Sequence, residues 1–549
     1  MLTVAASSTS TASFTFSPAS PVAGQAVQFT DTSTGSPTSW QWNFGDGSTS
    51  TAQNPSLSYA TVASYNVTLT VSNSTGFKSV SQAITVGSGD GSMGAYWVSP
   101  TGAAAWANAK SATPLSGASC CSLSTANANA SAGDTVILRA GTYRTPLVPS
   151  HSGTSGAKII WRNYGSEYVL ISVNTGFDGY YYYNVLLWAI SWQVFDGINV
   201  KGDYTGPNAN ADNNMILAIW YDCNYNEFKN MDIDGNFGGR VTWRSASNTR
   251  PCLHNWIHDC TFHNVGAMYF GSNNLVDQTV GPQFEDGDNY TTIENCDFHH
   301  NGHCNLEFCG LYSVIKNNFL HNEGWLTNDT GYPVNEYYPD NLTGQSYGKW
   351  GHRNFMFQSW YGTYAGTYNL AENNRFGTCG PAAEVAGGEC FGVCAPRNII
   401  RYNDMFNSIN NNVLFKQGNS EPNTIWADYN TFYNNTIYSS GRYNNSIPPH
   451  GLWQGDGIFA PWNINLYVRV GNTVINNIVN STHGHYDIDM DDTRNTIANN
   501  FLAASGDPLF TNTNVTDPFN LTAPNFTLQA GSPCINAGTN LTNAVGSGS

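Results

Sequence analysis

Ile257-His258-Asp259-Cys260-Thr261-Phe262-His263-Asn264-Val265-Gly266 is a ten-residue phrase that recurs at residues 293–302 and 315–324. In every copy the first and sixth positions are apolar, the seventh is His, and a Gly closes the phrase. A phrase repeated along the chain indicates a repeat architecture, in which each copy contributes the same side chains to one continuous core.

Further copies of the phrase keep its spacing of apolar and polar residues but have no His at the seventh position. These copies lie at 371–380, 400–405, 432–441, 474–479 and 497–506, and residues 228–233 are an earlier copy. Many intervals are about 22 to 32 residues, a period typical of solenoids. Short β-rich phrases without helical periodicity favour a parallel β-helix. Each coil is expected to bury its first and sixth side chains and to stack its recurrent Asn on the next, with hydrogen bonds between the amides.

Composition limits the classes of partner. The 549 residues allow two or three domains, or one small domain and a long solenoid. Only 11% of residues are charged and the net charge is −17. This balance argues against nucleic acid, because phosphate binding needs clustered Lys and Arg. It also gives no long-range attraction to an anionic polysaccharide, unless a local cleft or bound calcium compensates.

The chain has 12 cysteines, and in a polar, Asn-rich sequence with extracellular traits we expect most to form disulfides. Cys260 and Cys296 hold equivalent positions in successive copies and are expected to stack. Zinc binding is disfavoured, because no paired C-x-x-C spacing occurs. No apolar run is long enough to insert into a membrane. The cysteines that lie close in sequence are Cys252/Cys260, Cys304/Cys309, Cys390/Cys394 and Cys120-Cys121.

The N-terminal part is predicted to be a separate β-sandwich. Residues 12–86 show the alternation of short strands, with the motif Trp42-Asn43-Phe44-Gly45-Asp46-Gly47 and a closing strand at 65–71. The segment resembles a PKD domain, an Ig-like module that usually serves as a spacer or adhesion unit on secreted proteins. Residues 1–11 and the Gly/Ser-rich 87–94 are predicted linkers.

The segment from 95 to 540 resembles the right-handed parallel β-helix proteins of the secreted pectate-lyase-like group. Residues 96–102 (YWVSPTG) and 132–143 (AGDTVILRAGTY) match the way these chains begin, and 525–538 matches the way they end. Residues 541–549 are a predicted C-terminal linker. The fold class is therefore all-β. This fold hosts lyases, hydrolases, epimerases, adhesins and shells, so it does not define the function.

The candidate active site lies around the histidine-bearing copies. Equivalent positions of successive coils lie one inter-strand spacing apart, so His263, His299 and His321 should form a column. Two departures from regular coils, 278–289 and 325–350, flank it. We predict a catalytic set of His299, His303, His321, Glu323 and Arg353. A structural ladder of imidazoles and a metal site of two His with Glu323 are the alternatives.

Aromatic and acidic residues supply the remaining candidates. Aromatic side chains around the second insertion could stack on sugar rings or simply pack the insertion onto the coils. Those predicted to bind substrate are Trp325, Tyr337, Tyr338, Trp350 and Trp360. Calcium is the only predicted cofactor, and a solvated acidic strand is the alternative for the last three of its predicted ligands. These ligands are Asp286, Asp288, Asp487, Asp489 and Asp491.

The sequence favours a secreted polysaccharide-processing enzyme, a lyase or a glycoside hydrolase, acting in a cleft on the β-helix. Its partner is then a polysaccharide or cell-surface glycan, and neither nucleic acid nor membrane insertion is expected. The alternative is a non-catalytic extracellular protein that self-associates into a surface layer, sheath or filament. Low charge, many aromatics and many cysteines fit this alternative.

Overall fold

The computed structural model describes most of the N-terminal half of the chain and the regular coils beyond it. The described residues are 10–17, 21, 26–59, 63–86, 94–173, 182–203, 214–244, 250–265, 281–285, 287–301, 304–323, 353–358, 366–379, 389–406, 413–415, 427–438, 458–459, 470–480, 488–489, 494–502, 510–512, 525–530 and 532–534.

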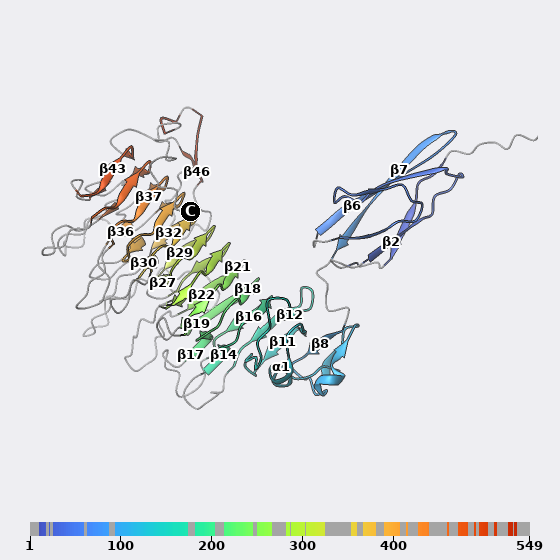
Figure 1. The fold of residues 1–549 in the computed structure, drawn as a ribbon, viewed down its shortest axis with the longest axis horizontal. Coiled ribbons are helices and arrows are strands. Elements are labelled where there is room, and N and C mark those ends of the chain that lie inside the picture. Colours follow the sequence, from blue (N-terminus) through green and yellow to red (C-terminus); the bar gives the residue numbers. More distant parts are fainter. Residues whose placement is uncertain are drawn as a thin grey trace, which may run out of the picture.

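The N-terminal unit is a β-sandwich of two antiparallel sheets (Figure 1). Its interior is aromatic, with Phe29 and Trp42 fully buried. The Trp42 indole Nε1 donates to the Ala52 carbonyl at 2.9 Å, so the buried ring keeps its hydrogen bond. The three-stranded sheet has β1 (Phe14–Ser17), β2 (Ala26–Asp31) and β5 (Ser56–Ser58), and the four-stranded sheet has β3 (Ser39–Asn43), β4 (Thr49–Ser50), β6 (Ala63–Asn73) and β7 (Gly76–Val86).

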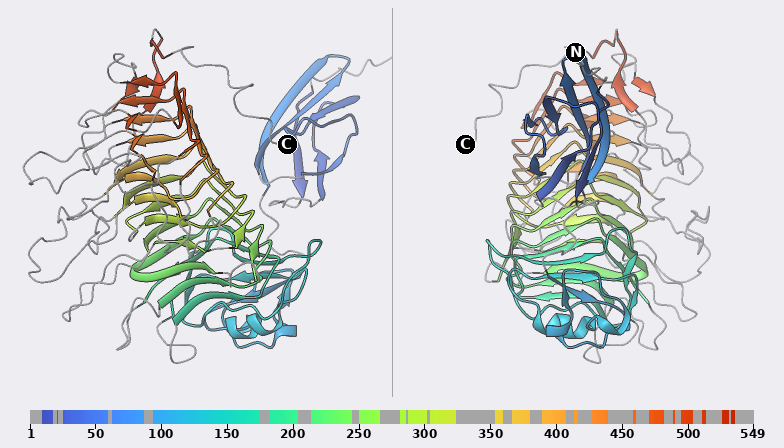
Figure 2. Two further views of the ribbon diagram at one scale, coloured as in Figure 1. Left: turned by 60° about the vertical axis from the view of Figure 1, so that its left-hand side comes forward. Right: turned by 90° about the vertical axis from the view of Figure 1, so that its right-hand side faces the viewer.

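The second unit is a parallel β-helix, whose stacked coils appear in Figures 1 and 2. One face is a fourteen-stranded sheet of the described residues, parallel except for the pairing of its first two strands. Its strands are β8 (Ala95–Val98), β9 (Lys110–Ser111), β10 (Thr135–Leu138), β12 (Ile159–Asn163), β15 (Gln193–Asp196), β18 (Glu227–Lys229), β21 (Trp256–His258), β25 (Thr292–Glu294), β28 (Val314–Lys316), β31 (Leu370–Glu372), β34 (Ile399–Arg401), β37 (Thr431–Tyr433), β40 (Thr473–Ile475) and β43 (Thr496–Ala498).

The other two faces are joined in one sheet, to which most coils contribute two strands. Its described strands are β11 (Gly141–Tyr143), β13 (Val169–Ile171), β14 (Tyr182–Trp188), β16 (Ile198–Lys201), β17 (Asn214–Trp220), β19 (Asp232–Arg244), β22 (Thr261–Val265), β23 (Gln283–Phe284), β26 (Asp297–His299), β27 (Cys304–Phe308), β29 (Phe319–Glu323), β30 (Arg353–Phe357), β32 (Arg375–Cys379), β33 (Glu389–Val393), β35 (Asp404–Phe406), β36 (Val413–Phe415), β38 (Thr436–Tyr438), β39 (Ile458–Phe459), β41 (Ile478–Asn480), β42 (Ile488–Asp489) and β44 (Phe501–Leu502).

A few short elements complete the description. Helix α1 (Leu123–Asn129) begins at the N-cap Ser122, whose hydroxyl accepts from the Thr125 backbone N–H. No described helix has the length and hydropathy needed to cross a membrane. The remaining elements are the 3₁₀ turns Trp106–Asn108 and Gly117–Ser119, the pair β20 (Cys252–Leu253) and β24 (Asp288–Asn289), and the pair β45 (Phe510–Asn512) and β46 (Asn525–Leu528).

The prediction about the core of the repeat is confirmed. Ile257 pairs with Ile293, and Ile293 with Ile315, all fully buried. The sixth position behaves in the same way, with Phe262 stacked on Phe298 at 4.8 Å between ring centroids. The apolar positions of the phrase thus form two continuous interior columns, which is why the repeat can bury a core without long strands.

Stacked asparagines line the turn between the two sheets, as predicted. Each amide Nδ2 donates to the Oδ1 of the Asn in the next coil at 2.9–3.0 Å, and each backbone N–H donates to the same Oδ1. These bonds satisfy buried polar groups that the turn would otherwise leave unpaired. The members of this asparagine ladder are Asn318, Asn374, Asn403, Asn435, Asn477 and Asn500.

Two cysteines take the place of asparagine at the start of this column, and the prediction of disulfides is wrong for them. Cys260 and Cys296 are buried free thiols, whose Sγ atoms donate to the carbonyls of His258 at 3.1 Å and Glu294 at 3.3 Å. No described cysteine forms a disulfide. Both thiols fill interior positions and donate to carbonyls of their own coil.

One outer corner of the β-helix carries a column of aromatic rings that the sequence analysis missed. Tyr225, Tyr290, Tyr312 and Tyr368 are all exposed, and neighbouring rings stack 4.1 to 5.4 Å apart. Every member has φ between 54° and 60°, in the left-handed region that disfavours large side chains. We infer that ring stacking offsets this strain. The full column is Trp192, Tyr225, His254, Tyr290, Tyr312, Tyr368, Arg397 and Tyr429.

Candidate active site

The predicted histidine column exists on the outer face of strands β22, β26 and β29. His263 pairs in register with His299, and His299 with His321. The ring centroids of successive histidines lie 5.2 and 5.3 Å apart. The column therefore follows from the repeat, because identical positions of a parallel stack lie one strand spacing apart.

Each end of the column is paired with a carboxylate. His263 Nε2 lies 2.9 Å from Asp232 Oδ1, and His321 Nε2 lies 3.0 Å from Asp297 Oδ1. The central His299 has no such partner, and its Nδ1 lies 2.7 Å from the Nδ1 of the buried His300. The two outer histidines are thus each paired with a carboxylate, whereas the central His299 is paired with the imidazole of His300. The column is therefore not a uniform ladder of equivalent imidazoles.

Burial and neighbouring charges give the members different protonation states. Burial, assisted by the positive charge of His321 and His263, lowers the pKa of His299 to about 4. Burial also opposes protonation of His263, but Asp232 and Asp234 outweigh it and raise its pKa. For Asp297, the hydrogen bond from His321 and the nearby imidazoles outweigh burial, so its pKa is lowered. At neutral pH, Asp297 is therefore ionised and His299 is neutral.

An open groove of about 480 Å³ lies at the corner where the fourteen-stranded sheet turns into strands β22, β26 and β29. Asp259 and Asp297, from successive coils, both line it. Their side chains are 48% and 43% exposed, so both carboxylates can reach a ligand from solvent. The lining residues are Asp259, Cys260, Thr261, Asn295, Cys296, Asp297, Asn317 and Phe319.

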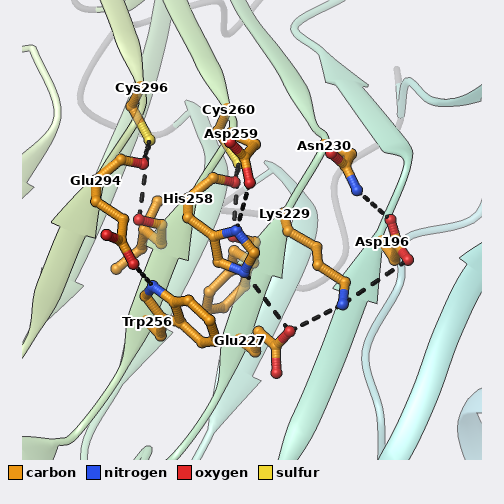
Figure 3. Close-up of polar contacts among 12 residues, drawn as sticks. Asp196, Glu227, Lys229, Asn230, Trp256, His258, Asp259, Cys260, Glu294 and Cys296 are labelled. Carbon is orange, nitrogen blue, oxygen red and sulfur yellow. Dashed lines mark hydrogen bonds and ion pairs between the residues drawn. The ribbon is translucent and has the colours of Figure 1, made fainter. Parts of the chain in front are cut away.

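Each groove carboxylate is held by an imidazole from behind. On one side, His258 Nδ1 lies 2.6 Å from Asp259 Oδ2 (Figure 3). On the other side, His321 binds Asp297, and the His321 ring is itself stacked on Phe319 at 4.0 Å. Two acids backed by two imidazoles in one groove are suited to proton transfer, because each carboxylate can exchange a proton with a ligand on one side and with its histidine on the other.

A network on the outer face of the fourteen-stranded sheet positions His258 (Figure 3). The Trp256 ring stacks on its imidazole at 4.0 Å, and Glu227 Oε1 lies 3.6 Å from its Nε2. Lys229 Nζ then lies 2.9 Å from the same Glu227 oxygen and 4.0 Å from Asp196. Alternate residues of a strand share one face, which is why Trp256 and His258 meet.

The predicted site residues have separate outcomes. His299 and His321 lie together on the outer sheet face, and His321 supports the groove. Glu323, Arg353 and Asp489 belong to strands β29, β30 and β42, but their side chains lie outside the described part of the structure. Also outside the described residues are His303, Trp325, Tyr337, Tyr338, Trp350, Trp360, Asp286, Asp487 and Asp491.

The structure places Asp288, a predicted calcium ligand, in the core of the β-helix. Its carboxyl is fully buried, because β24 pairs with β20 and places Asp288 beside Cys252. Burial, followed by the nearby Cys252 and Glu285, raises its pKa well above the ordinary value. Asp288 is therefore a neutral core acid, not a surface ligand. Among the described residues, no group of three or more His, Cys, Asp or Glu is arranged to hold a metal ion.

Asp288→Asn is expected to stabilise the β-helix at pH 8 and to have little effect at pH 3. The folded pKa of Asp288 is raised, so its favourable contribution is complete below the unfolded pKa of about 3.9 and is lost as pH rises toward the folded pKa. An uncharged Asn avoids that loss, so the variant should unfold at a higher temperature than the parent at pH 8. Thermal unfolding at both pH values measures it. An equal shift at pH 3 and pH 8 would contradict the assignment.

Two acids of the groove, Asp259 and Asp297, and the supporting His258 were missed in the sequence. A signal for Asp297 was present, since it stands two residues before the column histidine His299 and so shares its face of the strand. No comparable signal existed for Asp259, which stands at the corner itself with φ of 54°. Its direction depends on how sharply the chain turns there.

Comparison with known proteins covers the two units separately. Residues 13–87 match the family model of the PKD domain. The N-terminal sandwich is a PKD domain. The uncharacterized protein YwoF of Bacillus subtilis (strain 168) is 50% identical over 50 residues, which are 9% of this chain and 11% of that protein. The chain thus matches only about a tenth of this relative's length.

Beyond the PKD domain, the chain is similar in fold to solved parallel β-helix proteins. Pectate lyase Pel9A is 15% identical, with a TM-score of 0.46 and coverage of 83% of this chain and 96% of that one. The A-module of mannuronan C-5 epimerase AlgE6 of Azotobacter vinelandii is 10% identical, with a TM-score of 0.42 and coverage of 67% and 91%. Their names describe a lyase and an epimerase.

Proposed function

We propose that the chain is a polysaccharide-processing enzyme of the glycoside hydrolase type, with Asp259 and Asp297 as its acid–base pair. The observation that carries the proposal is the groove itself, where two half-exposed carboxylates from successive coils are each backed by a histidine. Glycosidic bonds are commonly hydrolysed by two carboxyl groups on opposite sides of the scissile bond.

The two acids receive different roles. Asp297 is ionised, because the imidazoles around it lower its pKa, and it is suited to activate water or to act as a nucleophile. Asp259 is the proposed proton donor to the leaving oxygen, and His258 Nδ1, at 2.6 Å, can return its proton. His321 keeps Asp297 oriented toward the groove.

Hydrolysis is favoured over elimination by the charge of the groove. A lyase acting on a uronate must neutralise the sugar carboxylate, which requires a cation near the substrate. The described lining residues include two carboxylates and neither Lys nor Arg. PKD domains are typically extracellular, so we place this activity outside the cell, on a polysaccharide or cell-surface glycan.

Product analysis tests the reaction type. The protein is incubated with a panel of neutral and uronate polysaccharides, and new reducing ends and unsaturated products are both measured. We expect reducing ends without unsaturation, and their loss in the double variant Asp259→Asn/Asp297→Asn. Unsaturated products, or full activity in the double variant, would overturn the proposal. Parallel reactions with calcium and with a chelator test the calcium prediction.

A panel without any product would favour the structural alternative. In that case the protein is expected to assemble into fibres or sheets that electron microscopy can detect. A soluble, inactive and unassembled protein would contradict both readings.

A further inference from the structure

Trp256 is an exposed aromatic residue on the outer face of the fourteen-stranded sheet. Its side chain is 40% exposed, and its register neighbours are Glu227 and Thr292. Along this outward column, from β18 to β43, Trp256 is the only aromatic residue of the described strands. The other members of the column are Glu227, Thr292, Val314, Leu370, Ile399, Thr431, Thr473 and Thr496.

The Trp256 ring is held in one orientation. Its indole Nε1 donates to Glu294 Oε1 at 2.7 Å (Figure 3). Glu294 is itself paired with Lys316 at 2.8 Å. One face of the ring covers the His258 imidazole, with an angle of 25° between the rings. The exposed area therefore belongs to the opposite face and the edge. A fixed and exposed indole face offers apolar contact at little cost in side-chain entropy.

The ring also stands next to the groove. Trp256 and His258 lie on the same face of β21, and Asp259 follows directly and lines the groove. Three residues of extended chain span only about 10 Å. A ligand long enough to occupy both places would therefore reach from the indole to the two carboxylates.

We propose that Trp256 forms a sugar-stacking subsite beside the groove, and that the ligand is a neutral glycan. The inference rests on the proposed function and adds to it a binding residue and a substrate class. The charges around the path are mainly acidic, with Asp259 and Asp297 in the groove and Glu294 beside the ring. Three cations lie near the path. Lys229 and Lys316 are engaged by carboxylates at 2.9 and 2.8 Å, and Arg375, over the Phe319 ring at 5.9 Å, lies 3.9 Å from Asp404. A uronate would meet repulsion here, whereas the hydroxyls and C–H faces of a neutral sugar would not.

Calorimetric titration tests binding without catalysis. In the Asp297→Asn background, the probes are cellohexaose, laminarihexaose, xylohexaose and hexagalacturonate. We expect at least one neutral hexasaccharide to bind and hexagalacturonate to bind much more weakly. Adding Trp256→Ala should weaken neutral binding about 10- to 100-fold, while Trp256→Phe should retain most of it. Tyr429→Ala is the matched control, because this aromatic residue is 54% exposed but lies five coils farther along the β-helix; it should change nothing.

Kinetics separate a subsite from a structural role. In the otherwise unaltered enzyme, Trp256→Ala should raise KM on the cleaved polysaccharide, and any accompanying fall in kcat reports the lost contact with His258. A fall in kcat at unchanged KM would mean that Trp256 acts through His258, and would overturn the inference. So would equal binding of hexagalacturonate, an unchanged affinity in Trp256→Ala, or no binding of any neutral probe. If the Asp259→Asn/Asp297→Asn variant is inactive and Trp256→Ala binds and cleaves like the parent, only this inference is refuted. If the double variant is active, the proposed function is refuted.

Discussion

Asp297→Asn is expected to lower kcat by about 10²- to 10⁴-fold while the protein stays folded. The amide has the size of the carboxylate but can neither accept a proton nor attack carbon. In the parent protein, the pKa of the Asp297 carboxyl is lowered because its partner His321 and the neighbouring imidazoles favour the charged form. The loss should therefore appear in kcat at every pH at which the parent enzyme is active, and a substrate panel with reducing-end detection measures it.

The control for this prediction comes from the same column of the sheet. Asp297 is followed in register by Phe319, Arg375 and then Asp404, which lies outside the groove. Burial raises the pKa of Asp404 to about 6, so it is also a perturbed acid. Asp404→Asn should leave the activity within about twofold of the parent. If both variants lose activity equally, the groove is not where the reaction occurs.

His321→Gln should give a smaller loss than Asp297→Asn, because His321 orients the carboxylate and does not line the groove. The physical signature of such a positioning role is a shift in the acidic limb of the pH–rate profile. Without the imidazole, the pKa of Asp297 should rise, so activity should be lost at higher pH on the acid side than in the parent. A uniform loss at all pH values would instead indicate that His321 exchanges a proton itself.

Asn374→Ala is expected to cause the largest loss of stability, about 3–5 kcal/mol. The amide of Asn374 is buried within the asparagine ladder. Its Oδ1 accepts from both the backbone N–H and the Nδ2 of Asn318, and its Nδ2 donates to the Ile315 carbonyl and to Asn403. Alanine removes all four bonds and takes away the partner of the buried Asn318 backbone N–H and of the Ile315 carbonyl. The midpoint of urea unfolding of the β-helix measures the effect.

The neighbouring asparagine provides a matched control. Asn373 is exposed and has φ of 55°, a backbone conformation that Gly adopts without strain. Asn373→Gly should therefore change the unfolding midpoint very little. Similar losses in the two variants would mean that the ladder contributes through its turn conformation and not through its amide hydrogen bonds.

The sequence alone determined the architecture, because each copy of the phrase must place the same kinds of side chain at the same positions of its coil. A parallel stack needs the same apolar residue facing inward in every coil, so Ile257, Ile293 and Ile315 report the core directly. The same periodicity predicts the asparagine ladder and the column of His263, His299 and His321. Such columns are properties of spacing, and spacing can be read without coordinates.

The tertiary structure alone decided which of these side chains share a site. Asp259 and Asp297 hold different positions of the phrase in different coils, and they line one groove because the chain turns sharply at Asp259, with φ of 54°. Asp288 resembles a surface acid in sequence, but its strand directs it into the core beside Cys252. The direction of a non-repeating side chain depends on packing between coils, which no periodicity encodes.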